Sequence, residues 1–143
     1  MTTPAYDADN IFAKIIRGEM PCHKVYEDAD TFAFMDIMPR CDGHTLVIPK
    51  SPARNLLDAS PAQLAGCMVS VQKISSALMK AFAAPGIMLQ QFNEQAGGQV
   101  VFHLHFHVLP RWEGVPLGPH TGQMADQDVL AANAEKIRRA LAG

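Results

Sequence analysis

Histidine stands at every second position around residue 105, and apolar residues fill the positions between and beside the histidines. In an extended strand successive side chains point to opposite faces, so His103, His105 and His107 are expected to share one face. A purely structural strand would carry Thr, Lys or Ser on its polar face. This strand instead carries three imidazoles, which titrate near neutrality. We therefore interpret this strand, predicted over residues 100–110, as the functional site. Its other face is expected to pack into a core through Phe102, Leu104, Phe106 and Val108.

Strand geometry weighs against one metal ion bound by all three imidazoles. Zinc–nitrogen bonds are about 2.0–2.1 Å long, which places ligating nitrogens about 3.4 Å apart. His103 and His107 are expected to lie about 13 Å apart along an extended backbone, so joint ligation needs a strong bend. No cysteine or carboxylate lies between Gly97 and Arg111 to complete such a site. We favour a nucleophilic histidine flanked by two helpers, with a metal site as the alternative.

Length and charge limit the classes of protein that fit. A chain of 143 residues is long enough for one domain with a substantial core. Charged residues make up only 18% of it, which favours a protein that covers part of its surface, for example with a second copy. The formal net charge of -2 provides no long-range attraction for nucleic acid. Any bound phosphate therefore has to be held locally, by imidazoles and backbone N–H groups.

Cysteine usage and the first residues favour a cytoplasmic protein. Cys22, Cys41 and Cys67 are odd in number and form no C-x-x-C pair, so a disulfide framework is not expected. The first ten residues lack the basic start and apolar run of a signal peptide. No apolar run reaches the length needed to cross a bilayer, so no membrane partner is expected.

Apolar periodicity and turn residues predict an α+β fold. We expect an antiparallel sheet of about five strands with helices on one side, among them a short N-terminal helix and a long helix. Asp9 or Asn10 can cap the first helix, Gly18 can end it, and Ser60 and Asp126 can cap the later ones. The expected strands cover residues 24–27, 31–35, 44–49, 87–92 and 100–110, and the expected helices cover residues 11–17, 61–84 and 127–141.

One domain is expected over residues 1–143. Its core covers about residues 8–112, and residues 113–143 form a C-terminal extension that ends in a helix. We find no internal repeat and no low-complexity tract that indicates a second domain.

The segment from His103 to Leu109 fits the signature of the histidine-triad (HIT) superfamily, in which His-x-His-x-His is followed by two apolar residues. Residues 34–37 and 43–50 resemble the nucleotide-binding segment of that family, and residues 93–99 resemble its phosphate-proximal loop. These segments follow one another in the family's order and cover roughly residues 11–112. Asp36 makes the chain similar to the Hint branch, the nucleoside phosphoramidases.

This resemblance implies an α+β homodimer that attacks the α-phosphorus of a purine nucleotide or nucleotide conjugate. His105 is then the nucleophile, and water hydrolyses a nucleotidyl-histidine intermediate, so that one difficult displacement is split into two easier ones. His107 and His44 donate hydrogen bonds to phosphate oxygens, while His103 helps to hold the strand and the loop. The implied mechanism requires neither a metal nor another cofactor.

The same resemblance assigns substrate-binding roles outside the histidine strand. Asp36 is expected to accept both ribose hydroxyls, as a carboxylate can. Gly98, next to Gly97, is expected to let the backbone approach the phosphate and to offer fixed N–H donors. The remaining assignments are the base pocket for Ile37 and Phe12, the ribose-phosphate side for Asn93, and assistance to the leaving group for Gln99.

The sequence departs from the pattern of its HIT relatives at two places. Many Hint-like proteins carry a serine after the loop glutamine that can protonate the leaving group, and Val100 occupies that place here. Many bacterial relatives bind a structural zinc ion through cysteine and histidine ligands. The corresponding places here are Asn10, Ala13 and Pro52, so no structural zinc is expected.

Two other functions stay open at this point. The Fhit-like branch of the superfamily implies cleavage of dinucleoside polyphosphates, which requires more room beyond the α-phosphate. A nucleotide-binding interaction protein with little turnover, from a different functional class, fits the same residues. In the expected homodimer, the C-terminal helix or Trp112 is expected to cross onto the second subunit.

Overall fold

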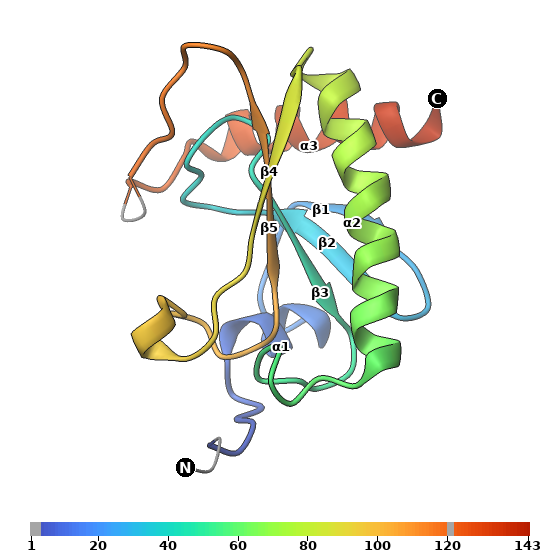
Figure 1. Ribbon diagram of the computed structural model, residues 1–143. Helices are drawn as coiled ribbons and strands as arrows, with labels where there is room; N and C mark the ends of the chain where they lie inside the picture. Colours follow the sequence, from blue (N-terminus) through green and yellow to red (C-terminus); the bar gives the residue numbers. More distant parts are fainter. Residues whose placement is uncertain (1–3, 120–121) are drawn as a thin grey trace.

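The computed structural model of the protein describes residues 4–119 and 122–143, which form a five-stranded antiparallel sheet and three α-helices (Figure 1). The strands lie side by side in the order β1-β2-β3-β5-β4. They are β1 (Lys24–Glu27), β2 (Thr31–Met35), β3 (Thr45–Pro49), β4 (Gly86–Gln90) and β5 (Phe106–Arg111). The helices are α1 (Ile11–Ile16), α2 (Pro61–Ala81) and α3 (Gln127–Ala142), and η1 (Gln95–Gly97) is a 3-10 turn. The predicted α+β fold is confirmed.

Local side chains explain where the first two helices begin. Asn10 caps α1, because its side-chain oxygen accepts from the Ala13 N–H at 2.9 Å. Ser60 and Gln63 form a reciprocal capping box at the start of α2, where Pro61 has no N–H that needs a partner. Both predicted helix starts are confirmed.

Alternate side chains of the central strands divide the core into two layers. Every residue of β2 and β3 is buried, so both faces of these strands need cover. Met35 and Val47 pack with α2 and α3, whereas Phe34 and Leu46 point the other way and pack with Phe12 of α1. The prediction that the helices cover one side of the sheet is therefore wrong: α1 lies on the face opposite to α2 and α3.

The predicted strand over residues 100–110 is only partly a strand. β5 begins at Phe106, so it carries His107, whereas His103 and His105 precede it in irregular backbone. The expectation that all three histidines share one face of a strand is therefore wrong.

The departure from the strand begins where the ladder with β3 stops. β3 pairs with β5 through three residue pairs, of which the last contains Phe106. Upstream of that pair the Leu104 N–H donates to the Ala53 carbonyl at 2.8 Å, in the loop after β3. Leu104 is fully buried in the core, as predicted. Phe102 instead packs under the Arg54 guanidinium, whose central carbon lies 4.1 Å from the ring centroid.

The C-terminal extension packs onto its own chain. Leu130 and Ile137 of α3 are buried in the same cluster as residues of α2 and the sheet. The Trp112 indole donates to the Phe82 carbonyl at 3.0 Å. Whether α3 or Trp112 also contacts a second subunit stays a prediction. In the part of the chain that the structure describes, no helix combines the length and the apolar character needed to span a membrane.

Candidate active site

A cavity of about 580 Å³ opens on the α1 side of the sheet and collects most of the predicted site residues. Its lining includes Phe12, Asp36, Ile37, His44, Gly98, Val100, His105 and His107. A second hollow lies between α2 and α3, and among the described residues no histidine, cysteine or carboxylate side chain lines it. We therefore place the candidate active site in the first cavity.

His105 is held in one tautomer by the backbone. Its Nδ1 lies 2.7 Å from the carbonyl oxygen of His103, and because a carbonyl only accepts, Nδ1 carries the proton. Burial lowers the pKa of His105 to about 4, so the ring is neutral at pH 7 and Nε2 is unprotonated. The Phe12 ring meets the imidazole edge to face, with centroids 4.9 Å apart. In this state Nε2 has the lone pair that a nucleophile needs.

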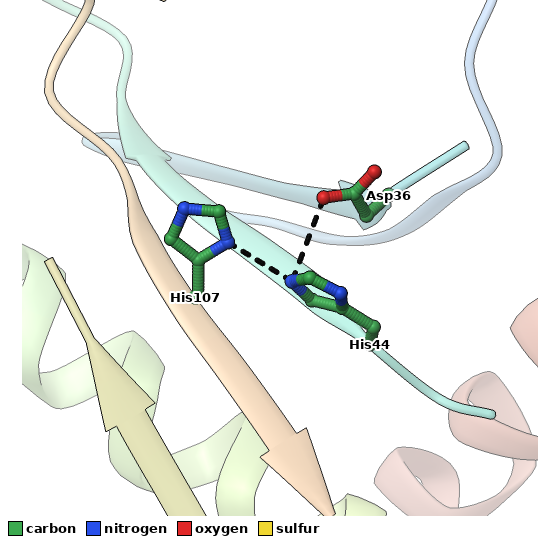
Figure 2. Close-up of side chains that lie close together, drawn as sticks. All are labelled: Asp36, His44 and His107. Carbon is green, nitrogen blue, oxygen red and sulfur yellow. Dashed lines mark hydrogen bonds and ion pairs between the residues drawn. The ribbon is translucent and has the colours of Figure 1, made fainter. Parts of the chain in front are cut away.

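A second chain of hydrogen bonds gives His107 the opposite tautomer (Figure 2). The Arg40 backbone N–H donates to His44 Nδ1 at 3.1 Å, so Nδ1 is unprotonated and the ring proton is on Nε2. That Nε2–H donates to His107 Nδ1 at 2.9 Å and lies 3.5 Å from Asp36 Oδ2. His107 therefore carries its proton on Nε2. Its ring centroid lies 5.0 Å from that of His105, so an imidazole with an unprotonated Nε2 and one with a protonated Nε2 are neighbours.

Asp36 lies at the start of the turn between β2 and β3 and faces the same cavity. Its Oδ1 accepts from the Met38 N–H at 2.9 Å, and its Oδ2 is the oxygen close to His44. Burial raises the pKa of Asp36 to about 6, an effect that the Met38 hydrogen bond only partly offsets. The ionised carboxylate has lone pairs left for a ligand at pH 7.

Asp36, His44 and His107 are close enough to be considered as metal ligands, because their ligand atoms all lie within 4.8 Å of one another. The hydrogen bonds oppose that role. A neutral imidazole has one nitrogen lone pair, and the Arg40 N–H already uses that of His44 at Nδ1. His44 Nε2 then carries a proton and cannot coordinate a metal. We assign no metal to these side chains.

Gln99 anchors the loop before the histidines and lies outside the cavity lining. It is 3% exposed, and its Oε1 accepts from the Asn55 amide and from the Glu94 N–H. Its Nε2 donates to the carbonyls of Arg54 and Val101. Because all four hydrogen-bonding positions of the amide are used, its geometry fits a loop anchor better than the expected contact with a leaving group.

Gly98 shapes the cavity through its backbone. Its φ of +98° suits glycine, and a Cβ there would lie 3.4 Å from the Phe92 ring. The N–H groups of Gly97 and Gly98 donate to the carbonyls of Glu94 and Gln95, both at 3.0 Å. The two N–H groups expected to face a phosphate are thus used inside η1 in this structure.

Asn93 and His103 also lie outside the cavity lining. The Asn93 side-chain oxygen accepts from the Leu56 N–H at 2.9 Å and so joins two loops. His103 is 1% exposed, and both ring nitrogens are hydrogen-bonded, Nε2 to the Pro49 carbonyl and Nδ1 to the Tyr6 hydroxyl. In this geometry the two side chains hold together the segments next to the cavity and do not face into it.

The sequence did not indicate all residues of the site. Arg40 acts through its backbone N–H, which its residue type does not reveal. Met124 and Gln127 line the cavity, and the Ala125 N–H donates to the Ile37 carbonyl at 2.9 Å, which ties this segment to the base of the turn after β2. Residues 122–127 carry no motif for catalysis or ligand binding, so only tertiary structure places them at the site.

Comparison with known proteins identifies a family whose sequences this chain matches. A family model described as the HIT domain matches residues 17–114. The adenylylsulfatase HINT3 of Arabidopsis thaliana is 42% identical over 105 residues, which cover 73% of this chain but only 53% of that longer protein. The adenosine 5′-monophosphoramidase hnt1 of Schizosaccharomyces pombe is 34% identical over 119 residues, with 76% of this chain and 86% of that protein covered.

Solved structures agree with the sequence matches. The crystal structure of a Hit-like protein involved in cell-cycle regulation from Bartonella henselae, with an unknown ligand, is 54% identical in sequence and superposes with a TM-score of 0.89. The superposition covers 95% of this chain and 99% of that one. Because the family model spans both Asp36 and the three alternating histidines, we conclude that this chain belongs to the HIT domain family.

Proposed function

We propose that the protein is a nucleotide hydrolase or transferase that attacks the α-phosphorus of a purine nucleotide conjugate with His105. The observation that carries this proposal is the pair of neighbouring imidazoles with opposite tautomers, an unprotonated Nε2 on His105 and a protonated Nε2 on His107. The names of two relatives, an adenylylsulfatase and an adenosine 5′-monophosphoramidase, support an adenosine monophosphate conjugate as the substrate class.

The reaction consists of two displacements at one phosphorus atom. In the first, the His105 Nε2 lone pair forms a bond to phosphorus, the bond to the leaving group breaks, and the leaving group takes up a proton from water. In the second, a water oxygen attacks the phosphorus, the bond from Nε2 to phosphorus breaks, and the attacking water releases a proton. Conjugate and water thus become nucleotide and leaving group, and neutral His105 is restored.

The other cavity residues hold the nucleotide in place. His107 donates its Nε2–H to a phosphate oxygen, which stabilises the charge that develops there. His44 acts through His107, because its own Nε2 proton is directed at His107 Nδ1. Asp36 accepts the ribose hydroxyls, and Phe12 and Ile37 pack against the base.

Val100 bears on the choice of leaving group. It lines the cavity, is 83% exposed and brings no proton donor. Conjugates with acidic leaving groups need no such donor, whereas an amine leaving group has to take its proton from water at this site. Parallel turnover of an adenosine 5′-phosphoramidate and a diadenosine polyphosphate separates the proposed activity from the dinucleoside polyphosphate hydrolase alternative.

Trapping the intermediate tests the proposal directly. We expect rapid quenching with adenosine 5′-phosphoramidate to give an adenylyl adduct on the wild type and none on His105→Gly, measured by intact-protein mass spectrometry. Loss of the nucleophile is expected to lower kcat by about 10,000-fold or more. His105→Asn serves as the binding control, because it keeps a polar side chain and is expected to leave AMP affinity nearly unchanged. AMP binding without adduct or turnover in the wild type would identify a binding module instead.

The pH profile of kcat/KM is expected to fall as the pH is lowered through about 6. Asp36, with its pKa raised to about 6, takes up a proton there and loses acceptor capacity for the ribose. His105, with its pKa lowered to about 4, remains neutral over the same range. An adenosine 5′-phosphate diester is the suitable substrate, because its phosphate does not titrate in this range. Asp36→Asn is expected to lower kcat/KM and to remove the inflection near pH 6; an unchanged inflection contradicts the assignment to Asp36.

We further expect the protein to be a homodimer at micromolar concentration. β4 is an edge strand of the sheet with Leu89 exposed, and α2 exposes Met68 and Val69, so a second copy can cover apolar surface. Sedimentation velocity measures the state. Val69→Glu, at an exposed position, is expected to weaken the dimer, whereas Gln72→Glu on the same helix is the matched control. A wild type that sediments only as a monomer overturns this expectation.

A further inference from the structure

Tyr6 precedes α1 and lies outside the region that the family model matches, yet its side chain reaches the histidine segment. Its hydroxyl lies 2.6 Å from His103 Nδ1, and the two rings meet edge to face with centroids 5.6 Å apart. His103 is buried, so this contact is made inside the protein. An N-terminal residue therefore forms part of the support of the histidines.

Backbone groups fix the direction of this hydrogen bond. His103 Nε2 lies 2.8 Å from the Pro49 carbonyl, which only accepts, so Nε2 carries the ring proton. Burial lowers the pKa of His103, which keeps the ring neutral and leaves Nδ1 as an acceptor. The Tyr6 hydroxyl is thus the donor to Nδ1.

Asn10 holds the Tyr6 hydroxyl in that orientation. Its Oδ1 accepts from the Ala13 N–H as the cap of α1, so the other side-chain atom is the amide nitrogen and can only donate. This nitrogen donates to the Tyr6 oxygen at 3.0 Å and to the Asp7 carbonyl at 2.7 Å. The Tyr6 oxygen accepts from Asn10, and its own proton is left for the imidazole of His103.

The carbonyl of His103 is the group that accepts from His105 Nδ1. The orientation of this carbonyl depends on how its own residue is held, since side chain and peptide share one Cα atom. The His103 ring is clamped at both nitrogens, by Pro49 and Tyr6, and the next peptide N–H is bonded to the loop after β3. Removing the Tyr6 hydroxyl leaves His103 Nδ1 as a buried, unsatisfied acceptor and lets His103 rotate.

We propose that Tyr6 is a positioning residue for the nucleophile: through His103 it holds the carbonyl that selects the His105 tautomer with an unprotonated Nε2. The inference rests on the proposed role of His105 as nucleophile. It assigns Tyr6 no contact with the substrate. Loss of the Tyr6 hydroxyl is therefore expected to lower the rate of attack on phosphorus and to leave nucleotide affinity unchanged.

The test compares Tyr6→Phe with Tyr26→Phe in the full-length protein. Each variant removes one hydroxyl, and that of Tyr26 bonds to Asp28 in the β1–β2 turn, away from the cavity. We expect Tyr6→Phe to lower kcat about 10- to 100-fold with adenosine 5′-phosphoramidate, as misplacement of a reacting group does. KM is expected to stay within about twofold, because binding contacts are kept. Tyr26→Phe is expected to match the wild type in both constants.

A spectroscopic readout separates positioning from general packing. Imidazole ¹⁵N chemical shifts are expected to show His105 protonated at Nδ1 only in the wild type and in Tyr26→Phe, and as a mixture of tautomers in Tyr6→Phe. Unchanged kcat in Tyr6→Phe overturns the proposal. A lower kcat with an unchanged His105 tautomer overturns it as well, because the loss then arises by another route.

A second variant keeps the test decisive if Tyr6→Phe folds poorly. Asn10→Asp preserves the cap of α1, because aspartate is an equally good N-cap. Its second oxygen accepts the Tyr6 proton instead of donating to the hydroxyl, so the clamp on His103 is lost and the same fall in kcat is expected. If the wild type shows neither an adduct on His105 nor turnover, the proposed function fails, whereas the ¹⁵N shifts still report whether Tyr6 sets the tautomer.

Discussion

The hydrogen bond from His105 Nδ1 to the carbonyl of His103 decides the chemistry of this site. A neutral imidazole carries one ring proton, so fixing it on Nδ1 leaves Nε2 with the lone pair that a nucleophile needs. The same rule gives the opposite result for His107, because the chain of bonds that reaches it through His44 starts at the Arg40 backbone N–H. A carbonyl accepts and an amide N–H donates, and neither role can be exchanged. Two backbone groups thus set two neighbouring imidazoles in complementary states.

The residue at which β5 begins determines whether the carbonyl of His103 is available to a side chain. In a strand with neighbours on both sides, such as β5, backbone carbonyls are used by the ladder. Because the ladder begins only at Phe106, the carbonyl of His103 is available to a side chain. Placing α1 on the face of the sheet opposite to α2 and α3 brings Phe12 against His105 and lets the cap residue of α1 reach Tyr6. The start of β5, α1 and the N-terminal segment therefore all help to position the imidazole of His105.

Patterns within a single segment were sufficient to predict most of the helices and strands, whereas contacts between residues distant in sequence could not be predicted from them. Alternation correctly placed Leu104 in the core, and capping residues correctly placed the starts of α1 and α2. Alternation could not show that the chain leaves the sheet before Phe106, because register depends on pairing with β3. It also could not show that the Gln99 amide is fully used by the loops around it. Residue type indicates which chemistry is available, and tertiary partners decide whether it faces the substrate.

The stereochemical course at phosphorus tests most directly whether His105 attacks the substrate. Each in-line displacement inverts the configuration, so two displacements through a nucleotidyl-histidine give net retention, and one direct attack by water gives inversion. Hydrolysis of an adenosine 5′-phosphorothioate conjugate of known configuration in ¹⁸O-labelled water yields a chiral product whose configuration can be assigned. Retention is expected if the unprotonated Nε2 of His105 is the nucleophile. Inversion would contradict the covalent route and would leave His105 as an aid to direct attack by water.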